Sequence, residues 1–150
     1  MRVTVPGYEI DDDPARVDPD AAWRFLSTEA YWGRWRPREV VDAQIASAWR
    51  VVGAYAAATG DMVGFARAFS DGAATAYLAD VYVVREHRGR GLGAAVLRLM
   101  IDDGPGTEFR WMLHTADAHG LYQRVGFAPP DPTYLERPGA PSRAPLPPGS

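Results

Sequence analysis

A segment rich in glycine and arginine, residues 85–93, constrains the fold of this chain more than any other feature. Residues 77–84 before it are rich in valine and tyrosine, which predicts a strand. Leu92, Val96 and Met100 after it follow helical spacing. The segment therefore predicts a tight turn between a strand and a helix, where glycine lets backbone N–H groups approach an anion. Such a turn suits a phosphate or pyrophosphate, and the arginines add charged donors.

Three phosphate-binding motifs can be compared with this turn. A Walker-type loop requires lysine, and the chain has none. A dinucleotide fingerprint is formally met by residues 89–94, but it expects an acid after the next strand, and Glu108 precedes that strand. The pattern R-x-x-G-x-G is met by Arg88, Gly91 and Gly93 directly after the strand. A turn that binds nothing is the alternative, although three glycines and three arginines in so short a segment disfavour it.

The composition limits the class of protein. The 150 residues suffice for one domain, and the absence of cysteine excludes disulfides, thiolate zinc sites and a thiol nucleophile. Three histidines without metal-site spacing predict no metal, and a net charge of -3 disfavours nucleic-acid binding. With no apolar leader and no membrane-length apolar run, we expect a cytoplasmic protein without membrane contact. The lysine-free, arginine-rich composition suggests a bacterial, GC-rich genome.

The order of predicted elements outlines one domain and a tail. We expect strands at residues 2–10, 49–58, 62–70, 77–84 and 109–115, helices at 19–27, 37–48, from 92 and at 118–124, and one edge strand at 134–137. Residues 1–137 would form the domain. Residues 138–150 are rich in proline and are expected to be a disordered tail.

Two segments near the N-terminus leave alternatives open. The acidic residues between positions 11 and 20 favour a solvated loop over a cation site, with Asp18 capping a helix that begins at Pro19. Residues 31–35 hold three large aromatic side chains, Tyr31 and Trp32 among them. These side chains either fold back onto the core or form a wall or lid of an acceptor site.

A second motif lies near the C-terminus. Residues 118–127 carry the pattern A-x-x-L-Y-x-x-x-G-F, which includes Tyr122, and the R-x-x-G-x-G pattern lies upstream. The pair resembles the GNAT superfamily of acetyl-CoA-dependent N-acetyltransferases, and the chain looks like a small bacterial branch with undefined acceptors. The resemblance implies an α+β fold with α/β/α layers and a central, mixed but mostly antiparallel sheet. The fourth and fifth strands of that sheet splay apart.

The resemblance also implies where acetyl-CoA binds. Backbone groups of the strand hydrogen-bond the pantetheine arm, and N–H groups of the turn hold the pyrophosphate. Many members carry asparagine at the position of Thr115, where it helps to hold the pantetheine arm. The implied cofactor-binding residues are Val81, Tyr82, Val83, Arg88, Gly89, Arg90, Gly91, Leu92, Gly93, Ala94 and Thr115.

The candidate catalytic residues each have more than one possible role. Tyr122 matches the tyrosine that protonates the leaving thiolate in the family, and a packed structural tyrosine is its alternative. Asp80 is a carboxylate inside an apolar run, so it either accepts the amine proton or serves as a structural hydrogen-bond acceptor. Asp117 is expected to be an N-cap rather than a catalyst, and His119 is a base, an acceptor contact or a plain surface residue. His114 is expected to be packed. The expected acceptor-binding residues are Tyr31, Trp32, Tyr77, Asp117 and His119.

These inferences lead to one expected function with two alternatives. The chain is expected to transfer an acetyl group from acetyl-CoA to a primary amine of a small acceptor, by direct attack in a ternary complex. Carboxylates near the expected cleft favour a cationic acceptor. The alternatives are acetylation of a protein N-terminus or lysine, and a non-catalytic module that binds acyl-CoA. Many members of the family dimerise, so a homodimer is a further expectation.

Overall fold

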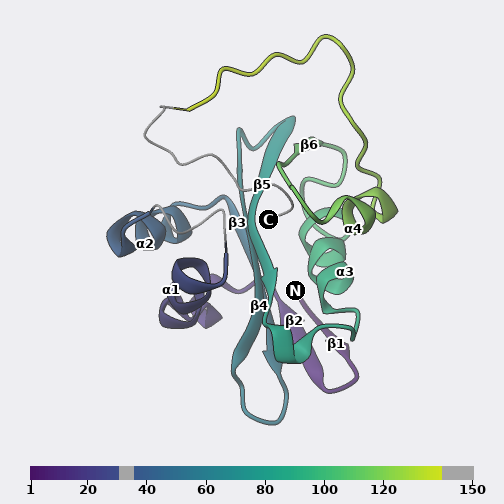
Figure 1. The fold of residues 1–150 in the computed structure, drawn as a ribbon. Helices are drawn as coiled ribbons and strands as arrows, with labels where there is room; N and C mark the ends of the chain where they lie inside the picture. The colour runs from purple at the N-terminus through teal and green to yellow at the C-terminus, as the bar shows by residue number, and fades with distance from the viewer. Residues whose placement is uncertain (31–35, 140–150) are drawn as a thin grey trace.

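The computed structural model describes residues 1–30 and 36–139, which fold around one mixed sheet (Figure 1). The strand order is β1-β2-β3-β4-β5-β6; neighbours pair antiparallel except β5 and β6, which are parallel. The strands are β1 (Arg2–Val5), β2 (Tyr8–Asp11), β3 (Arg50–Ala56), β4 (Met62–Ser70), β5 (Thr75–Val83) and β6 (Arg110–Met112). The predicted α+β architecture with a mixed, mostly antiparallel sheet is confirmed.

Helices cover both faces of the sheet. Figure 1 shows α1 (Pro19–Thr28) and α2 (Arg38–Ala46) on one side, and α3 (Leu92–Leu97) and α4 (His119–Arg124) on the other. Short helical turns are η1 (Pro14–Arg16), η2 (Arg85–His87) and the π-helical η3 (Arg98–Asp102), which continues α3. The chain therefore has the predicted three layers.

Each face of the sheet has its own apolar core. The α3–α4 core includes Leu78, Val96 and Tyr122, and the α1–α2 core includes Leu26, Val41 and Phe65. Alternate residues of a strand point to opposite faces, so the central strands contribute side chains to both cores. Nearly the whole of β3 and β4 is buried for this reason.

The predicted boundaries of several elements are confirmed and two are wrong. Asp18 caps α1 as expected, since its Oδ1 accepts hydrogen bonds from the next helical N–H groups. The single strand expected at residues 2–10 is instead a hairpin, because Pro6 and Gly7 form a turn with φ +83° at Gly7. Residues 134–137 form no edge strand.

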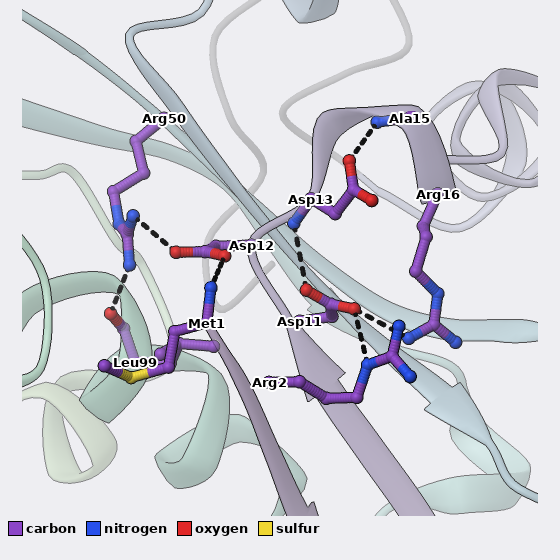
Figure 2. Close-up of polar contacts among 9 residues, drawn as sticks. All are labelled: Met1, Arg2, Asp11, Asp12, Asp13, Ala15, Arg16, Arg50 and Leu99. Carbon is purple, nitrogen blue, oxygen red and sulfur yellow. Dashed lines mark hydrogen bonds and ion pairs between the residues drawn. The ribbon is translucent and has the colours of Figure 1, made fainter.

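The acidic residues from the end of β2 onward combine ion pairs at Asp11 and Asp12 with an exposed, solvated part that includes Asp13 and Asp18. Figure 2 shows Asp11 between Arg2 and Arg16, at 2.9 and 2.8 Å. Burial alone would raise the pKa of Asp11, but these hydrogen bonds outweigh it and hold the pKa below its usual value. Asp13 caps η1 by accepting from the N–H of Ala15. The first two strands are thereby fixed to the segment that leads into α1.

Asp12 links the N-terminal hairpin to β3 and, through Arg50, to η3. It pairs with the amino group of Met1 and, at 2.9 Å, with Arg50 at the start of β3 (Figure 2). Arg50 also donates to the carbonyl of Leu99 at 2.8 Å. That carbonyl lies in η3, where the wider π-helical turn departs from ordinary helical hydrogen bonding. The acidic stretch therefore supports the helix that follows the glycine-rich turn.

Candidate active site

The candidate site begins where β5 and β6 separate. Their parallel pairing is limited to Thr75–Tyr77 opposite Arg110–Met112. Beyond Tyr77, β5 continues to Val83 with β4 as its only neighbour in the sheet. The splay predicted for the fourth and fifth strands is thus found between β5 and β6, the numbers being shifted by the extra N-terminal strand. We call residues 78–83 the open half of β5, because no described strand pairs with it on the side opposite β4.

A bulge at Asp80 reorients the open half. Asp80 has φ +53°, and Ala79 and Tyr82 lie opposite Arg67 and Phe65, so β5 carries one extra residue. Leu78 and Val81 consequently pack on the same core although they are three residues apart. A regular strand would place them on opposite faces.

The hydrogen bonds that end β5 indicate which backbone groups face the open edge. The N–H of Val84 donates to Val63 of β4 at 2.8 Å. Because these directions alternate along an antiparallel strand, the backbone of Val83, and of Val81 beyond it, is directed to the open edge. Tyr82 is then directed to β4, and its ring stacks on Phe25 with centroids 4.0 Å apart. Of the three residues expected to bind pantetheine, two are suited to it through their backbone.

The glycine-rich turn has the backbone shape of an anion site. Gly89 and Gly91 have φ of +76° and +78°, and an added Cβ would meet no atom within 4 Å at either residue. Glycine is therefore required here by backbone conformation and not by crowding. Gly91 precedes α3 and provides no side-chain cap, so the first N–H groups of the helix are left to other partners.

The arginines of the turn are anchored to the protein. Arg88 donates through Nε to the carbonyl of Val83 at 2.8 Å, which fixes the turn to the end of β5. Arg90 donates to the hydroxyl of Tyr8 at 2.7 Å, and the same hydroxyl lies 2.8 Å from Nδ1 of His87. Both arginines still place positive charge beside the turn.

The two sequence motifs meet in space. A Cβ added to Gly93 would lie 3.6 Å from Leu121, so α3 starts against α4. Tyr122 on α4 is buried in the α3–α4 core, against which Val81 and Val83 also pack, and its ring meets Phe127 edge-on. The motif tyrosine is therefore held on the face of the sheet that carries the glycine-rich turn.

Asp80 is held by two arginines. Arg36 forms a bidentate pair with it at 2.9 and 2.8 Å, and Nε of Arg67 donates at 2.6 Å. Burial alone would raise the pKa of Asp80, but the hydrogen bonds and positive charges of these arginines outweigh it and lower the pKa. A carboxylate bound in this way is a weak proton acceptor. Of the two alternatives that the sequence left open, the geometry favours a structural hydrogen-bond acceptor.

The remaining expected site residues surround the point of separation. Tyr77 is the last residue of β5 that pairs with β6. Its hydroxyl lies 2.5 Å from Nδ1 of His114. The expectation that His114 is packed is wrong: its side chain is 58% exposed. Asp117 and His119 are exposed near the start of α4. Tyr31 and Trp32 lie outside the described residues.

The cap of α4 differs from the one expected. Ala118 is the N-cap residue, and among the described residues no side chain makes a capping hydrogen bond to α4, so Asp117 is not the cap. The Oγ1 of Thr115 accepts from the N–H of Ala118 at 3.1 Å and so stabilises the turn that leads into the helix. Thr115 therefore has a structural task beside the one implied by the family resemblance.

A cavity of about 910 Å³ adjoins these residues. It is bordered by β6 and the chain that follows it, by α4, and by residues 127–135. His114, Thr115, His119 and Tyr122 are among its lining residues. In residues 1–30 and 36–139 no group of three metal-binding side chains gathers, and none of the helices there is long and apolar enough to span a bilayer.

The comparisons with known proteins agree with this geometry. The profile of the acetyltransferase (GNAT) family matches residues 17–127, and the protein belongs to that family. It is an enzyme of the acyltransferase class, as the resemblance implied. No curated protein matches the chain.

Solved structures give the same result. A GNAT-family protein from Xanthomonas campestris pv. campestris shares 35% identity, with a TM-score of 0.83 over 92% of this chain and 96% of that one. A candidate acetyltransferase from Deinococcus radiodurans R1 shares 22% identity, with a TM-score of 0.65 over 91% and 94%. Glucosamine-6-phosphate N-acetyltransferase from Arabidopsis thaliana shares 13% identity, with a TM-score of 0.55 over 87% and 97%. The last two demonstrate the fold alone.

Proposed function

We propose that the protein transfers an acetyl group from acetyl-CoA to a primary amine of a small acceptor, by direct attack in a ternary complex. The observation that carries the proposal is the open half of β5, which ends at the glycine-rich turn. Unpaired strand edges are normally covered in proteins. A strand edge that no described neighbouring strand covers, beside a glycine-rich turn, suits a ligand with amides at one end and phosphates at the other.

The residues present fit acetyl-CoA. The backbone of Val81 and Val83 can bind the amides of the pantetheine arm. The N–H groups from Gly89 to Ala94 can bind the pyrophosphate, where positive φ at two glycines lets them converge. Arg88 and Arg90 add positive charge. When bound, acetyl-CoA supplies the activated thioester.

Tyr122 is the proposed general acid. Its hydroxyl would hold the proton that the departing sulfur takes up. Its place in the α3–α4 core, against which Val81 and Val83 also pack, supports this role because these strand residues border the proposed pantetheine site. A strand N–H at the open edge would stabilise the negative charge that develops on the carbonyl oxygen.

The acceptor is proposed to be a small amine. The sequence argument for a cationic acceptor rested on carboxylates near the expected cleft, and the structure changes which carboxylates can be counted. Asp80 is neutralised by Arg36 and Arg67 and no longer supports it. Asp117 and His119 near the start of α4, and Glu136 near His114, are among the polar groups that remain as candidates for contacting the acceptor. An amino sugar is one class to include, because a structural neighbour acts on glucosamine 6-phosphate.

The test is release of CoA thiol from acetyl-CoA across a panel of amines. The panel contains spermidine, an aminoglycoside, glucosamine 6-phosphate, free amino acids and short peptides. We expect turnover with one class of small amine, and calorimetry to detect acetyl-CoA binding without an acceptor. Turnover only with peptides would favour the protein acetyltransferase. Binding without turnover on any amine would favour the non-catalytic module, and absence of binding would contradict the assignment of the turn and the open edge.

A further inference from the structure

A chain of three hydrogen-bonding side chains crosses the point where β5 and β6 separate. The hydroxyl of Tyr77 lies 2.5 Å from Nδ1 of His114, and Nε2 of the same ring lies 2.8 Å from Oε2 of Glu136. The three residues come from β5, from the chain just after β6, and from the C-terminal segment. None of these contacts is used by the roles assigned above.

The partners determine the tautomer of His114. A carboxylate can only accept a hydrogen bond, so Nε2 carries the proton that it donates to Glu136. In the neutral ring Nδ1 is then an acceptor, and it faces the O–H of Tyr77. The order carboxylate, imidazole, hydroxyl is the arrangement that lets a histidine take a proton from a hydroxyl group.

The position of this chain connects it to the candidate site. Tyr77 is paired with Met112 at the last step before the strands separate. His114 follows Met112 by two residues and lines the same cavity as Tyr122. A proton acceptor and the proposed proton donor thus border one cavity, as a reaction that removes one proton and supplies another requires.

We propose that Tyr77, His114 and Glu136 form the proton relay that deprotonates the acceptor amine, an inference that rests on the proposed acetyl transfer. As the amine nitrogen bonds to the acyl carbon and the carbon–sulfur bond breaks, one N–H proton moves to the oxygen of Tyr77. Tyr77 passes its own proton to Nδ1 of His114, and Tyr122 protonates the sulfur. Glu136 is the positioning residue: it stabilises the imidazolium and holds the ring.

The surroundings of Tyr77 favour coupled transfer over a free phenolate. Burial, followed by the negative charge of Glu136, raises the pKa of Tyr77. The phenol therefore gives up its proton to His114 only as it receives another. The titratable or charged groups that face the relay or line the cavity beside it are Arg67 on β4, Arg110 on β6, Asp131 and Tyr134 on the C-terminal segment, and His119 and Tyr122 on α4.

The alternative is a purely structural contact that pins the C-terminal segment to the sheet. Three variants separate the two roles: His114→Gln, Tyr77→Phe and Glu136→Gln. We expect His114→Gln to lower kcat/KM near neutral pH by about 100-fold or more, a usual contribution of a general base. Calorimetric affinity for acetyl-CoA should stay unchanged in all three. Glu108→Gln, an exposed residue before β6, is the matched control and should retain full activity.

The pH profile is the readout that a structural role would not move. The wild-type protein and His114→Gln should differ in how kcat/KM depends on pH, because the relay supplies a proton acceptor that the variant lacks. In His114→Gln the rate should instead follow deprotonation of the free amine. NMR of labelled histidine should show the Nε2–H tautomer for His114 in the resting protein and a change of tautomer population in Glu136→Gln.

Each outcome has one meaning. If wild-type protein acetylates an amine and His114→Gln is as active with the same pH profile, the relay is wrong and the proposed function stands. An Nδ1–H tautomer at neutral pH also overturns the relay. If wild-type protein acetylates no amine of the panel, the proposed function fails and the relay fails with it.

Discussion

The two halves of β5 differ in how their backbone groups are paired. Thr75–Tyr77 lie between β4 and β6, whereas the open half has β4 on one side only. The paired half fixes the register of the sheet, and the open half leaves hydrogen-bonding groups for a ligand. The comparison shows that this site arises where a parallel pairing stops after three residues, next to a bulge that redirects the strand.

The largest expected effect comes from breaking the ion pairs of Asp80, which lies in the open half, with Arg36 and Arg67. Asp80→Ala leaves Arg36 and Arg67 buried without their shared carboxylate, which should lower the free energy of unfolding by about 3–5 kcal/mol. Asp80→Asn should also destabilise, although asparagine tolerates the positive φ. Urea unfolding measures both. Asp61→Ala, an exposed change in the β3–β4 turn, is the control.

The same pair predicts the response to acid. The pKa of Asp80 is lower in the folded state, so its contribution to stability is complete above the pKa of the unfolded carboxyl. The contribution is lost as the pH falls through the lower folded pKa. Urea midpoints should therefore fall more steeply with acid in wild-type protein than in Asp80→Asn. An Asp80→Asn protein as stable as wild type, but inactive, would instead indicate the catalytic role that the sequence also allowed.

These ion pairs also indicate what the sequence could and could not predict. Asp80 and Arg67 are lone charges in neighbouring apolar strands, and that complementarity is a signal for a pair. Arg36 lies far away along the chain, and nothing local marks it as the second partner. Likewise the Pro6–Gly7 turn was readable as a hairpin, whereas the bulge at Asp80 depends on pairing with β4.

The sequence predicted the backbone conformation of the motifs better than it predicted the contacts of individual side chains. Glycine positions and the strand-turn-helix order were predicted because backbone conformation depends on local sequence. The contact of His114 with Glu136 was not, since the two residues are distant in the chain and the second lies in a segment expected to be a strand. Acceptor-site side chains are set by such long-range contacts, so sequence patterns locate them less well.

Tyr122→Phe tests the proposed general acid, which lies in the α3–α4 core on one face of the sheet. We expect kcat to fall by about 100-fold, because the thiolate loses its proton donor, with acetyl-CoA affinity unchanged. Stopped-flow turnover and calorimetry measure the two quantities. Tyr55→Phe is the matched control: within the described residues the Tyr55 hydroxyl is buried without a hydrogen-bond partner, in the opposite core. Equal loss of affinity and turnover in Tyr122→Phe would contradict the general-acid role.

A pair of glycine variants tests whether the turn after the open half binds phosphates. Gly91 and Gly60 both have φ +78° and open space around an added Cβ. Alanine at either position should therefore lower stability by a similar amount, about 1–2 kcal/mol. Only Gly91→Ala should weaken acetyl-CoA binding, and it should affect phosphate-free acetyl-pantetheine far less. Equal affinities of the two variants for acetyl-CoA would place the pyrophosphate elsewhere.

The smallest effect is expected at Thr115, in the chain between β6 and α4. Thr115→Val removes the oxygen that accepts from Ala118 and should cost about 1 kcal/mol of stability. Thr115→Ser keeps that oxygen and should cost less. If Thr115 only stabilises the turn before α4, acetyl-CoA affinity should be the same in both variants once the fraction of folded protein is accounted for. If it also binds the pantetheine arm, Thr115→Val should weaken acetyl-CoA and acetyl-pantetheine equally, because the contact lies away from the phosphates. For Gly91→Ala, by contrast, acetyl-CoA binding should weaken far more than acetyl-pantetheine binding, so the two variants together distinguish the ends of the ligand.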